Sequence, residues 1–268
     1  VEDQRFTPPL TLAAIDTLDC RTDSVRLAVE VPRPLPSMVY RWEGTDGATL
    51  DAPDPLTVIV RRPGAYRFTV IDTLSGCSNQ LAAPVVEDRA APFVSAGIDR
   101  QLDCRKPEVL LDASATATGA EMIYEWTTAS GSFSDRRNPL GPLVDAPGWY
   151  VLQVRNDRNG CRGLDSVQVV RDLTAPLIEA AVSERLDCDV PEVLLLARNL
   201  DSTQSISYQW EGIDDLFFSA GGERAAVQRA GQYRLIAINE STGCPAADTV
   251  EVLQNGNLPQ AIEWKARP

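Results

Sequence analysis

Residues 147–170 read PGWYVLQVRNDRNGCRGLDSVQVV, and this stretch decides the fold. The Pro-Gly pair interrupts the chain, and the residues after it alternate or run apolar, which is typical of a β-strand. Asn156 opens a turn that closes at Gly160, because an Asx side chain caps a turn and glycine supplies positive φ. The residues after Cys161 have the pattern of a second strand. The stretch therefore predicts two strands joined by a hairpin that ends in a cysteine.

The same pattern occurs three times in the chain. It returns as PGAYRFTVIDTLSGC over residues 63–77 and as AGQYRLIAINESTGC over residues 230–244. Six cysteines follow the same period, the first members of successive pairs recurring every 84 residues and the second members after 84 and then 83. They are Cys20, Cys77, Cys104, Cys161, Cys188 and Cys244. Such a strict period predicts a tandem array of similar domains.

Two further motifs complete the repeated frame. Each copy begins with Leu-Asp-Cys, and a Tyr-x-Trp pair follows with its Trp 22 residues after that cysteine. Residues two apart on a strand point to the same face, so each pair places two aromatic rings on one side of one strand. A Trp repeated at one strand position is typical of a sandwich core. We therefore predict core positions for Tyr40, Trp42, Tyr124, Trp126, Tyr208 and Trp210.

No segment carries a sustained helical period, whereas short β-branched runs, turns and 19 prolines are spread over the chain. This pattern predicts an all-β protein of three tandem β-sandwiches, each with about seven strands, in an elongated array. The connections are short, end in proline and lack a Gly/Ser-rich stretch, so we expect stiff joints. The predicted repeats span 8–91, 92–175 and 176–258. Residues 1–7 are expected to be the tail of a preceding repeat or an exchanged strand, and residues 259–268 the start of a following segment.

The regular cysteines suggest a pairing within each copy, as extracellular proteins use them. Zinc binding and nucleophilic catalysis are the alternatives, but ligand cysteines cluster within a few residues, and these pairs are about 57 residues apart in a chain without His. We predict one disulfide in each copy: Cys20–Cys77, Cys104–Cys161 and Cys188–Cys244. On the loop-entropy model each bond would contribute about 4 kcal/mol.

Composition excludes several classes of partner. The net charge of −13 disfavours nucleic acid, heparin and anionic membranes, because all would be repelled. Only 2 of the 25 basic residues are Lys, which reflects codon bias or arginines that bridge carboxylates between neighbouring domains or subunits. The absence of His removes the commonest general base and metal ligand. No apolar run has the length of a membrane span, so we expect no membrane insertion in this segment.

Site candidates are few. We find no Ser/His/Asp set, no phosphate loop and no acid/base pair, so we predict no catalytic residues, no cofactor and no enzyme activity. Acidic residues at the predicted joints, Glu87, Asp88 and Asp172, are weak calcium candidates, because calcium needs six or more converging oxygens. Solvated acidic loops are the alternative. Trp149 and Trp264 are not repeated and are candidates for exposed contacts. The repeated Asp of Leu-Asp-Cys is interpreted as a hydrogen-bond acceptor in a turn.

The second copy resembles PKD-like domains, which are immunoglobulin-like β-sandwiches. The resemblance rests on Ser95-Ala96-Gly97-Ile98-Asp99, Leu111-Asp112-Ala113-Ser114, Tyr124-Glu125-Trp126 and Pro147-Gly148-Trp149-Tyr150. The added Leu-Asp-Cys and Gly-Cys look like a disulfide-bearing variant found in tandem in very large bacterial surface proteins of the type IX secretion, gliding-motility-associated type. The first and third copies lack the Asp-Ala-Ser motif. The resemblance implies a secreted, cell-surface location and no catalytic residues.

Together these observations predict a non-enzymatic extracellular structural or adhesive repeat protein. It would be a rod or fibre segment of a surface adhesin or filament, assembling head to tail with other copies or with adjoining repeats. The first alternative is a module that binds a polysaccharide or a host surface. The second alternative is an accessory region of a larger secreted enzyme.

Overall fold

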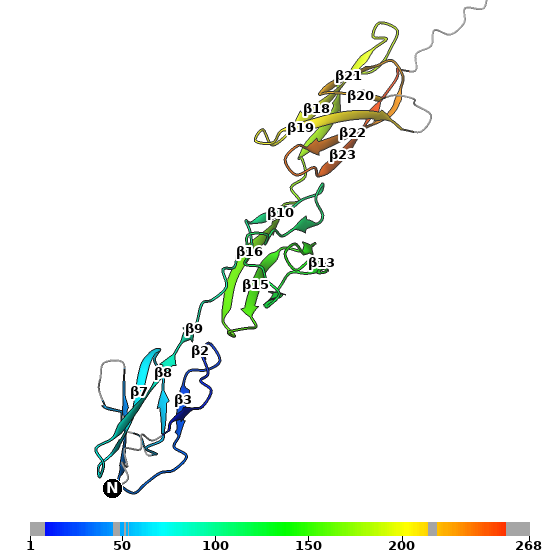
Figure 1. The fold of residues 1–268 in the computed structure, drawn as a ribbon. Helices are drawn as coiled ribbons and strands as arrows, with labels where there is room; N and C mark the ends of the chain where they lie inside the picture. The colour runs from blue at the N-terminus through cyan, green and yellow to red at the C-terminus, as the bar shows by residue number, and fades with distance from the viewer. Residues whose placement is uncertain (1–8, 45–48, 51, 53, 214–218, 256–268) are drawn as a thin grey trace, which may run out of the picture.

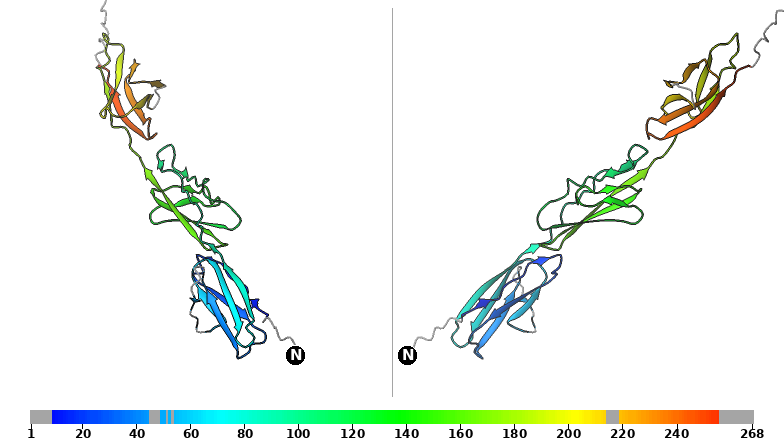
Figure 2. Two further views of the ribbon diagram at one scale, coloured as in Figure 1. Left: turned by 60° about the vertical axis from the view of Figure 1, so that its left-hand side comes forward. Right: turned by 90° about the vertical axis from the view of Figure 1, so that its right-hand side faces the viewer.

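The computed structural model describes residues 9–44, 49–50, 52, 54–213 and 219–255. Over these residues the regular secondary structure consists of β-strands, so the predicted all-β class is confirmed. The strands form three units that follow one another in an elongated row (Figures 1 and 2). The predictions for residues 1–7, residues 259–268 and Trp264 fall outside the described residues.

Each unit contains a four-stranded and a three-stranded sheet, and the second unit carries the hairpin predicted above. One sheet has the strand order β10-β16-β15-β12, and the other has the order β11-β14-β13. β15 and β16 pair antiparallel, from Gly148 opposite Val169 to Arg155 opposite Arg162, so the predicted hairpin is confirmed. The strands are β10 (Arg100–Leu102), β11 (Val109–Leu110), β12 (Met122–Thr128), β13 (Phe133–Asp135), β14 (Leu143–Val144), β15 (Gly148–Asn156) and β16 (Arg162–Arg171).

The first unit has sheets of order β5-β4-β7-β8 and β1-β3-β6. Its strands are β1 (Thr11–Leu12), β2 (Leu18–Asp19), β3 (Val25–Glu30), β4 (Met38–Glu43), β5 (Thr49–Leu50), β6 (Thr57–Val60), β7 (Gly64–Asp72) and β8 (Ser78–Val85), and β9 (Glu87–Asp88) lies in the connection to the second unit. The Tyr-x-Trp strand β4 pairs with β7, as β12 pairs with β15.

The third unit repeats this arrangement with sheets of order β20-β19-β22-β23 and β17-β18-β21. Its strands are β17 (Ile178–Val182), β18 (Val193–Asn199), β19 (Ile206–Gly212), β20 (Ser219–Gly221), β21 (Arg224–Val227), β22 (Gly231–Asn239) and β23 (Pro245–Val252). The hairpin of β22 and β23 is in register from Gly231 opposite Val252 to Ile238 opposite Pro245.

Each unit has a hydrophobic core of its own. Apolar and exposed residues alternate along its strands, so the apolar side chains of the two sheets face each other and fill the space between them. The three repeated Trp side chains are buried, with 2%, 7% and 0% exposed for Trp42, Trp126 and Trp210. The Tyr of each Tyr-x-Trp pair is half-buried against the same core. The Trp42 ring lies 5.0 Å from that of Phe68, which lies opposite it on β7.

A tyrosine at the start of the hairpin recurs as a second fixed point. Its hydroxyl donates to the backbone carbonyl four residues earlier: Tyr66 to Arg62 at 2.9 Å, Tyr150 to Ala146 at 2.6 Å and Tyr233 to Arg229 at 2.8 Å. This is the tyrosine corner of immunoglobulin-like sandwiches, which ties a strand to the turn before it.

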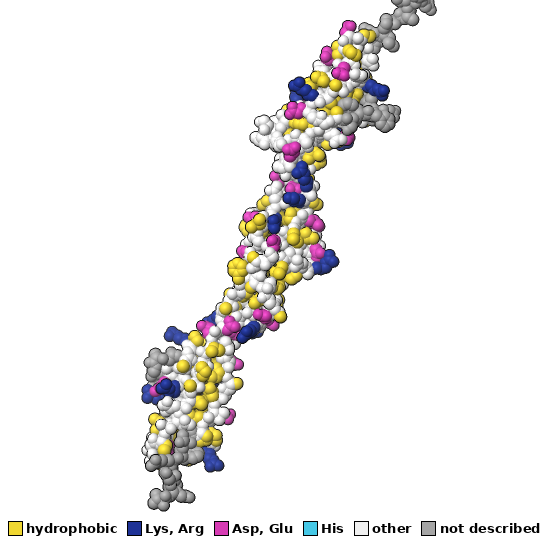
Figure 3. All heavy atoms as spheres, turned by 45° about the horizontal axis from the view of Figure 1, so that its top comes forward, with side chains coloured by type: hydrophobic (Ala, Val, Ile, Leu, Met, Phe, Trp, Pro, Cys, Tyr) yellow, Lys and Arg dark blue, Asp and Glu magenta, His cyan; other side chains and the backbone are white. Residues whose placement is uncertain are grey.

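The surface carries charges of both signs along the row. Acidic and basic side chains are interspersed over all three units on the face drawn in Figure 3, and both kinds gather where the first unit meets the second. Within the described part of the chain, the structure contains no helix that is long and apolar enough to cross a membrane.

Candidate functional site: the disulfide-bonded joints between repeats

The disulfides connect neighbouring units. Cys20 of the first unit bonds Cys161 of the second, with Cα atoms 5.0 Å apart, and Cys104 of the second bonds Cys244 of the third, again 5.0 Å apart. Cys77 and Cys188 are free thiols. The predicted pairing within copies, Cys20–Cys77, Cys104–Cys161 and Cys188–Cys244, is therefore wrong.

The physical reason is that the two cysteines of one unit lie at opposite ends of its sandwich. Cys77 precedes β8, which has 8 residues and therefore extends for about 26 Å toward β9. Cys20 follows β2, and β2 pairs with β9 beyond the other end of β8. Bonded cysteines need Cα atoms within about 7 Å of each other, so Cys20 and Cys77 are out of reach.

We call the end of a unit that carries the Gly-Cys hairpin its leading end, with Cys77, Cys161 or Cys244. The trailing end carries the Leu-Asp-Cys loop, with Cys20, Cys104 or Cys188. A joint is then the contact of one trailing end with the next leading end. The first joint contains Cys20–Cys161 and the second contains Cys104–Cys244.

The Leu-Asp-Cys loop is held in place by the connection that leaves the unit. Leu18 pairs in parallel with Glu87, Leu102 with Arg171, and Leu186 with Gln254. Each leucine is buried and fixes the loop to the core, with 0%, 1% and 4% of its surface exposed. The cysteine two residues later is therefore placed beside the chain that continues into the following unit.

The aspartate of the loop closes a turn, in agreement with its interpretation from the sequence. Asp19 Oδ1 accepts the backbone N–H groups of Arg21 at 2.8 Å and Thr22 at 2.7 Å. Asp103 and Asp187 each accept the equivalent pair of N–H groups. The N–H of Arg21, and then that of Thr22, lowers the pKa of the half-buried Asp19 carboxyl, because both bonds favour the ionised form. These aspartates shape the loop that presents each cysteine.

The Gly-Cys hairpin has one geometry in all three units. In the second unit Asn156 Oδ1 accepts the N–H of Arg158 at 2.9 Å, and the Gly160 N–H donates to the Asn156 carbonyl at 2.8 Å. Gly160 has φ of 72°, a left-handed conformation that glycine adopts without steric cost. The side chain of Asn159 accepts the N–H of Cys161 at 3.0 Å. The hairpin is thus rigidly shaped around its cysteine.

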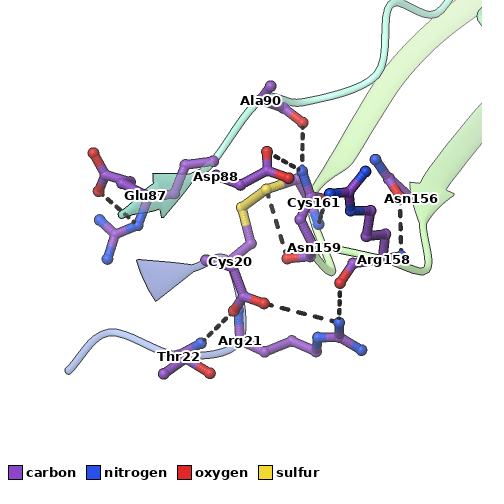
Figure 4. The surroundings of a disulfide bond; sticks show 12 residues. Cys20, Arg21, Thr22, Glu87, Asp88, Ala90, Asn156, Arg158, Asn159 and Cys161 are labelled. Atoms are coloured by element: carbon purple, nitrogen blue, oxygen red, sulfur yellow. Dashed lines mark hydrogen bonds and ion pairs between the residues drawn. A yellow bond between two sulfur atoms is a disulfide. The ribbon is translucent and has the colours of Figure 1, made fainter. Parts of the chain in front are cut away.

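The first joint surrounds its disulfide with hydrogen bonds (Figure 4). The Cys20 N–H donates to the Asn159 carbonyl at 3.1 Å, and Arg21 Nη2 donates to the Arg158 carbonyl at 2.5 Å. Asn159 Nδ2 donates to Asp88 Oδ1 at 2.9 Å and to the Ala90 carbonyl at 3.0 Å. Asn159 is only 2% exposed, so these bonds satisfy a buried amide. The hairpin therefore contacts both the preceding loop and the connecting chain.

The second joint has the same design with different side chains. The Cys104 N–H donates to the Thr242 carbonyl at 3.1 Å, and Arg105 Nη1 donates to the Glu240 carbonyl at 2.8 Å. Thr242 Oγ1 donates to the Thr174 carbonyl at 2.8 Å. Arg21 and Arg105 thus bridge neighbouring units, as the second interpretation of the arginine excess expects, but they donate to backbone carbonyls and not to carboxylates.

In both joints the hairpin glycine leaves room for the preceding loop. A Cβ added at Gly160 would lie 2.5 Å from Cγ of Arg21, and one at Gly243 would lie 2.1 Å from Cγ of Arg105. Both distances are shorter than real Cβ contacts, so glycine is required for close approach as well as for its backbone conformation. Within each joint, loop and hairpin are therefore in direct contact.

The two disulfides close long loops, with sequence separations of 141 and 140 residues. On the loop-entropy model each contributes about 5 kcal/mol by restricting the unfolded chain. Each joint thus has two covalent connections, the polypeptide and the disulfide. Two connections side by side oppose hinge bending more strongly than a single one.

The calcium candidates make contacts within the protein. Glu87 Oε1 lies 3.2 Å from Arg89 Nε, Asp88 accepts from Asn159, and Asp172 accepts from both the N–H and the hydroxyl of Thr174. The Thr174 hydroxyl, followed by its N–H, lowers the pKa of Asp172. Among the described residues no group of three or more His, Cys, Asp or Glu could hold a metal ion. The calcium assignment stays a prediction.

Trp149 projects from β15 beside the hairpin strand β16. Its side chain is 54% exposed, and Gln168 lies opposite it on β16. The structure therefore leaves the Trp149 ring accessible, whereas it buries the three repeated Trp rings.

No protein-family model matches this chain, and a search of curated proteins finds no match. Solved structures similar to it include the I-band fragment I67-I69 from titin, at 10% identity over 92% of this chain and 99% of that one, with a TM-score of 0.39. Others are Drosophila OTK extracellular domains 3-5 (11%, 92% and 92%, TM-score 0.29) and the N-terminal four Ig domains of Dscam1 isoform 8.4 (13%, 92% and 73%, TM-score 0.25). At these identities and TM-scores the resemblance assigns no function to the chain.

Proposed function

We propose that this chain is a non-enzymatic, extracellular structural segment: a stiff rod of immunoglobulin-like repeats locked together at their joints. The observation that carries the proposal is the repeated joint, in which a disulfide, a hydrogen-bonded loop and a short connection hold each pair of neighbours. A binding domain needs no such connection to its neighbours, whereas a spacer that must keep its length does.

The proposed mechanism is mechanical. Bending at the first joint would move the Cys20 loop away from the Cys161 hairpin, and the disulfide blocks that movement. Bending toward the disulfide would compress the contact of Arg21 with Gly160, where a Cβ already has no room. The joint therefore opposes bending in both directions, and repetition of the joint extends the rod.

Disulfides persist in oxidising compartments, which supports a secreted or cell-surface location. The PKD-like motifs support the finer proposal of a bacterial surface adhesin, stalk or filament exported by type IX secretion. The repeat boundaries 8–91, 92–175 and 176–258 belong to the same proposal. Its partners are adjoining repeats or other copies of the chain.

The test combines disulfide mapping with small-angle scattering. Peptide mapping under non-reducing conditions is expected to recover Cys20–Cys161 and Cys104–Cys244, and scattering is expected to give an elongated particle. The double variant Cys20→Ser/Cys104→Ser should remain folded but show a broader distribution of maximum dimensions, because only the polypeptide then limits bending. Cys188→Ser removes a thiol that is free within the chain, so it is the matched control and should leave the scattering profile of the monomer unchanged. A compact particle, or recovery of Cys20–Cys77, would refute the proposal.

A second candidate function is recognition of a polysaccharide or host surface by the exposed Trp149 ring, since aromatic faces stack on sugar rings. A glycan array probed with the chain should then show binding that Trp149→Ala removes. Leu164→Ala, which truncates another exposed apolar side chain of the same unit, should leave that binding intact. Binding unaffected by Trp149→Ala would contradict this candidate.

A further inference from the structure

The two free thiols lie at the two outer ends of the row. Cys77 belongs to the leading end of the first unit and Cys188 to the trailing end of the third. Every other cysteine of these two classes is bonded to a member of the opposite class. Within the described structure, Cys77 and Cys188 are therefore two halves of the joint that the chain builds twice internally.

The Cys188 loop already has the conformation seen in the bonded loops. Asp187 Oδ1 accepts the N–H groups of Asp189 at 2.9 Å and Val190 at 2.8 Å. The Asp187 N–H donates to the Val190 carbonyl at 3.1 Å, as Asp103 donates to Lys106 at 3.1 Å in the second joint. Cys188 is exposed, and so are Cys20 and Cys104 on the surface of their own loops. No rearrangement of this loop is needed to form a joint.

The Cys77 hairpin is also preformed. The Gly76 N–H donates to the Asp72 carbonyl at 2.8 Å, and the Cys77 N–H donates to Ser75 Oγ at 3.3 Å, the same pattern as in the bonded hairpins. Gly76 has φ of 73°, against 72° for Gly160 and 70° for Gly243. The hairpin therefore has the shape that receives a preceding loop.

What differs at Cys77 is that the docking position is open. A Cβ added at Gly76 would meet nothing within 4 Å, whereas at Gly160 and Gly243 it would meet the arginine of the docked loop. Ser75 is exposed, whereas its counterparts Asn159 and Thr242 are buried. Beside the hairpin lies a hollow lined by Arg33, Leu35, Ser37, Met38, Asp72, Leu74 and Ser75. This leading end has the form of a joint surface without its occupant.

We propose that the Cys77 hairpin of one molecule forms a third joint with the Cys188 loop of a second copy of this chain, and that a disulfide closes it head to tail. Cys77 lies in the first unit and Cys188 in the third, and these units form the two ends of the row (Figure 1), so the two thiols are out of reach of each other within one molecule. In a dimer joined by this head-to-tail contact, one hairpin and one loop stay free. Further copies can therefore add at both ends and extend the dimer into a fibre. The inference rests on the proposed rod function, since it extends the same joint between molecules.

The covalent step needs a disulfide oxidant such as oxidised glutathione. The Cys188 thiolate attacks the oxidant, forms a mixed disulfide and releases one glutathione thiolate. The Cys77 thiolate of the second copy then attacks the Cys188 sulfur, forms the Cys77–Cys188 bond and releases the second glutathione thiolate. Two protein thiols lose two protons and two electrons, and the oxidant is reduced to two thiols.

The intermolecular joint differs from the internal joints at one position. Arg21 and Arg105 follow their cysteines and donate to carbonyls of the opposing hairpin, but Asp189 follows Cys188 and has no N–H in its carboxylate to donate. Leu74, 87% exposed, stands at the hairpin position that Arg158 occupies in the first joint. We expect a joint that forms more slowly than the internal ones and depends on its disulfide.

The decisive experiment mixes two single variants. Cys77→Ser retains only the Cys188 loop, and Cys188→Ser retains only the Cys77 hairpin, and neither change removes a disulfide that the structure contains. Each variant alone, in a glutathione redox buffer, should remain mostly monomeric on a non-reducing gel. Their equimolar mixture should give a heterodimer several-fold above either sample alone, with a Cys77–Cys188 peptide in its mass spectrum. The wild-type chain should give a ladder that a reductant collapses.

A gain-of-function variant tests the geometry of the joint. Asp189→Arg restores the arginine present in both internal joints and should raise the initial rate of cross-linking several-fold. Asp189→Ala is the matched control, because it removes the negative charge without supplying a donor, and it should raise the rate less.

Two results would overturn the inference. One is a mixture with no more dimer than its components, although both thiols react with an alkylating reagent. The other is a native molecule in which Cys188 is bonded to a residue other than Cys77. Failure of the rod function would appear elsewhere, as an internal disulfide map that lacks Cys20–Cys161 and Cys104–Cys244.

Discussion

Asn159 of the second unit donates from Nδ2 to Oδ1 of Asp88, in the connection from the first unit, at a distance of 2.9 Å. The amide is almost fully buried, and the same Nδ2 also reaches the Ala90 carbonyl at 3.0 Å. One side chain thus attaches the hairpin of one repeat to the chain that leaves the previous repeat. Its position next to the Cys20–Cys161 bond makes it a test of how much the noncovalent contacts contribute to the joint.

Asn159→Ala is expected to destabilise the first joint by about 1–3 kcal/mol, because buried partners lose their hydrogen bonds. The measurement is urea denaturation of the chain with its disulfides intact. Ser75→Ala changes the equivalent hairpin residue at an end that makes no joint within the chain, and its effect should be clearly smaller. Equal effects of the two substitutions would mean that Asn159 acts only within its own hairpin.

Gly160→Ala and Gly76→Ala form a matched pair. Both place a side chain on a left-handed backbone, which costs about 1–2 kcal/mol. Only the Gly160 substitution also meets Arg21, whereas the position of Gly76 is open. We expect Gly160→Ala to be the more destabilising in thermal unfolding and to slow formation of Cys20–Cys161 during oxidative refolding. Indistinguishable melting temperatures and refolding rates would contradict the close contact at the joint.

Acid should destabilise the leading hairpin of the first unit. Hydrogen bonds from the hydroxyls of Ser37 and then Ser75 lower the pKa of Asp72 from its ordinary value to about 2. A folded-state pKa below the unfolded one means stability that is present above about pH 4 and is lost as the pH falls through about 2. Asp72→Asn should remove this dependence while retaining the turn, since the other two hairpins have Asn156 and Asn239 there. NMR titration of the Asp72 carboxyl is the direct measurement. A pKa at the ordinary value of an aspartate would show that the serine hydroxyls do not stabilise the ionised carboxylate.

Tyr150→Phe is expected to destabilise the second unit by about 1–3 kcal/mol. The Tyr150 hydroxyl donates to the Ala146 carbonyl at 2.6 Å and accepts the Ser132 N–H at 3.1 Å. Removing the hydroxyl therefore breaks both hydrogen bonds. Tyr66→Phe removes only the bond to Arg62 and should have the smaller effect on its own unit. Calorimetry of the two variants decides the order, and a larger loss for Tyr66→Phe would reverse the explanation.

The hairpins could be predicted from sequence because their signals are local. Asn156, Gly160 and the apolar alternation around them specify a turn and two strands without reference to the rest of the chain. A local signal also predicts that the two rings of each Tyr-x-Trp pair share one face of a strand. The recurrence of Tyr66, Tyr150 and Tyr233 is visible in the sequence, but it does not predict their hydroxyl hydrogen bonds. An aromatic residue is common in a strand for its ring alone, so the sequence gives no sign that the hydroxyl has a partner.

The cysteine pairing could not be predicted from the same signals. A period of 84 residues is equally compatible with Cys20 bonding Cys77 in its own repeat and with Cys20 bonding Cys161 in the next. The choice depends on the end of the sandwich at which each cysteine lies. That end is set by a short parallel pairing, in which Leu18 lies opposite Glu87 and Asp19 lies opposite Asp88. A pairing of this length produces no recognisable pattern in the sequence. The free thiols Cys77 and Cys188 follow directly from that choice.

The two disulfide-closed loops, from Cys20 to Cys161 and from Cys104 to Cys244, overlap along the sequence. A protease that cuts one peptide bond anywhere between Cys20 and Cys244 therefore leaves all pieces in one covalent molecule, because at least one bridge spans every such cut. Pairing within repeats would have left the connections between repeats as single points of severance. The bridges therefore hold the molecule together after scission at a connection such as 86–91, where most residues are exposed.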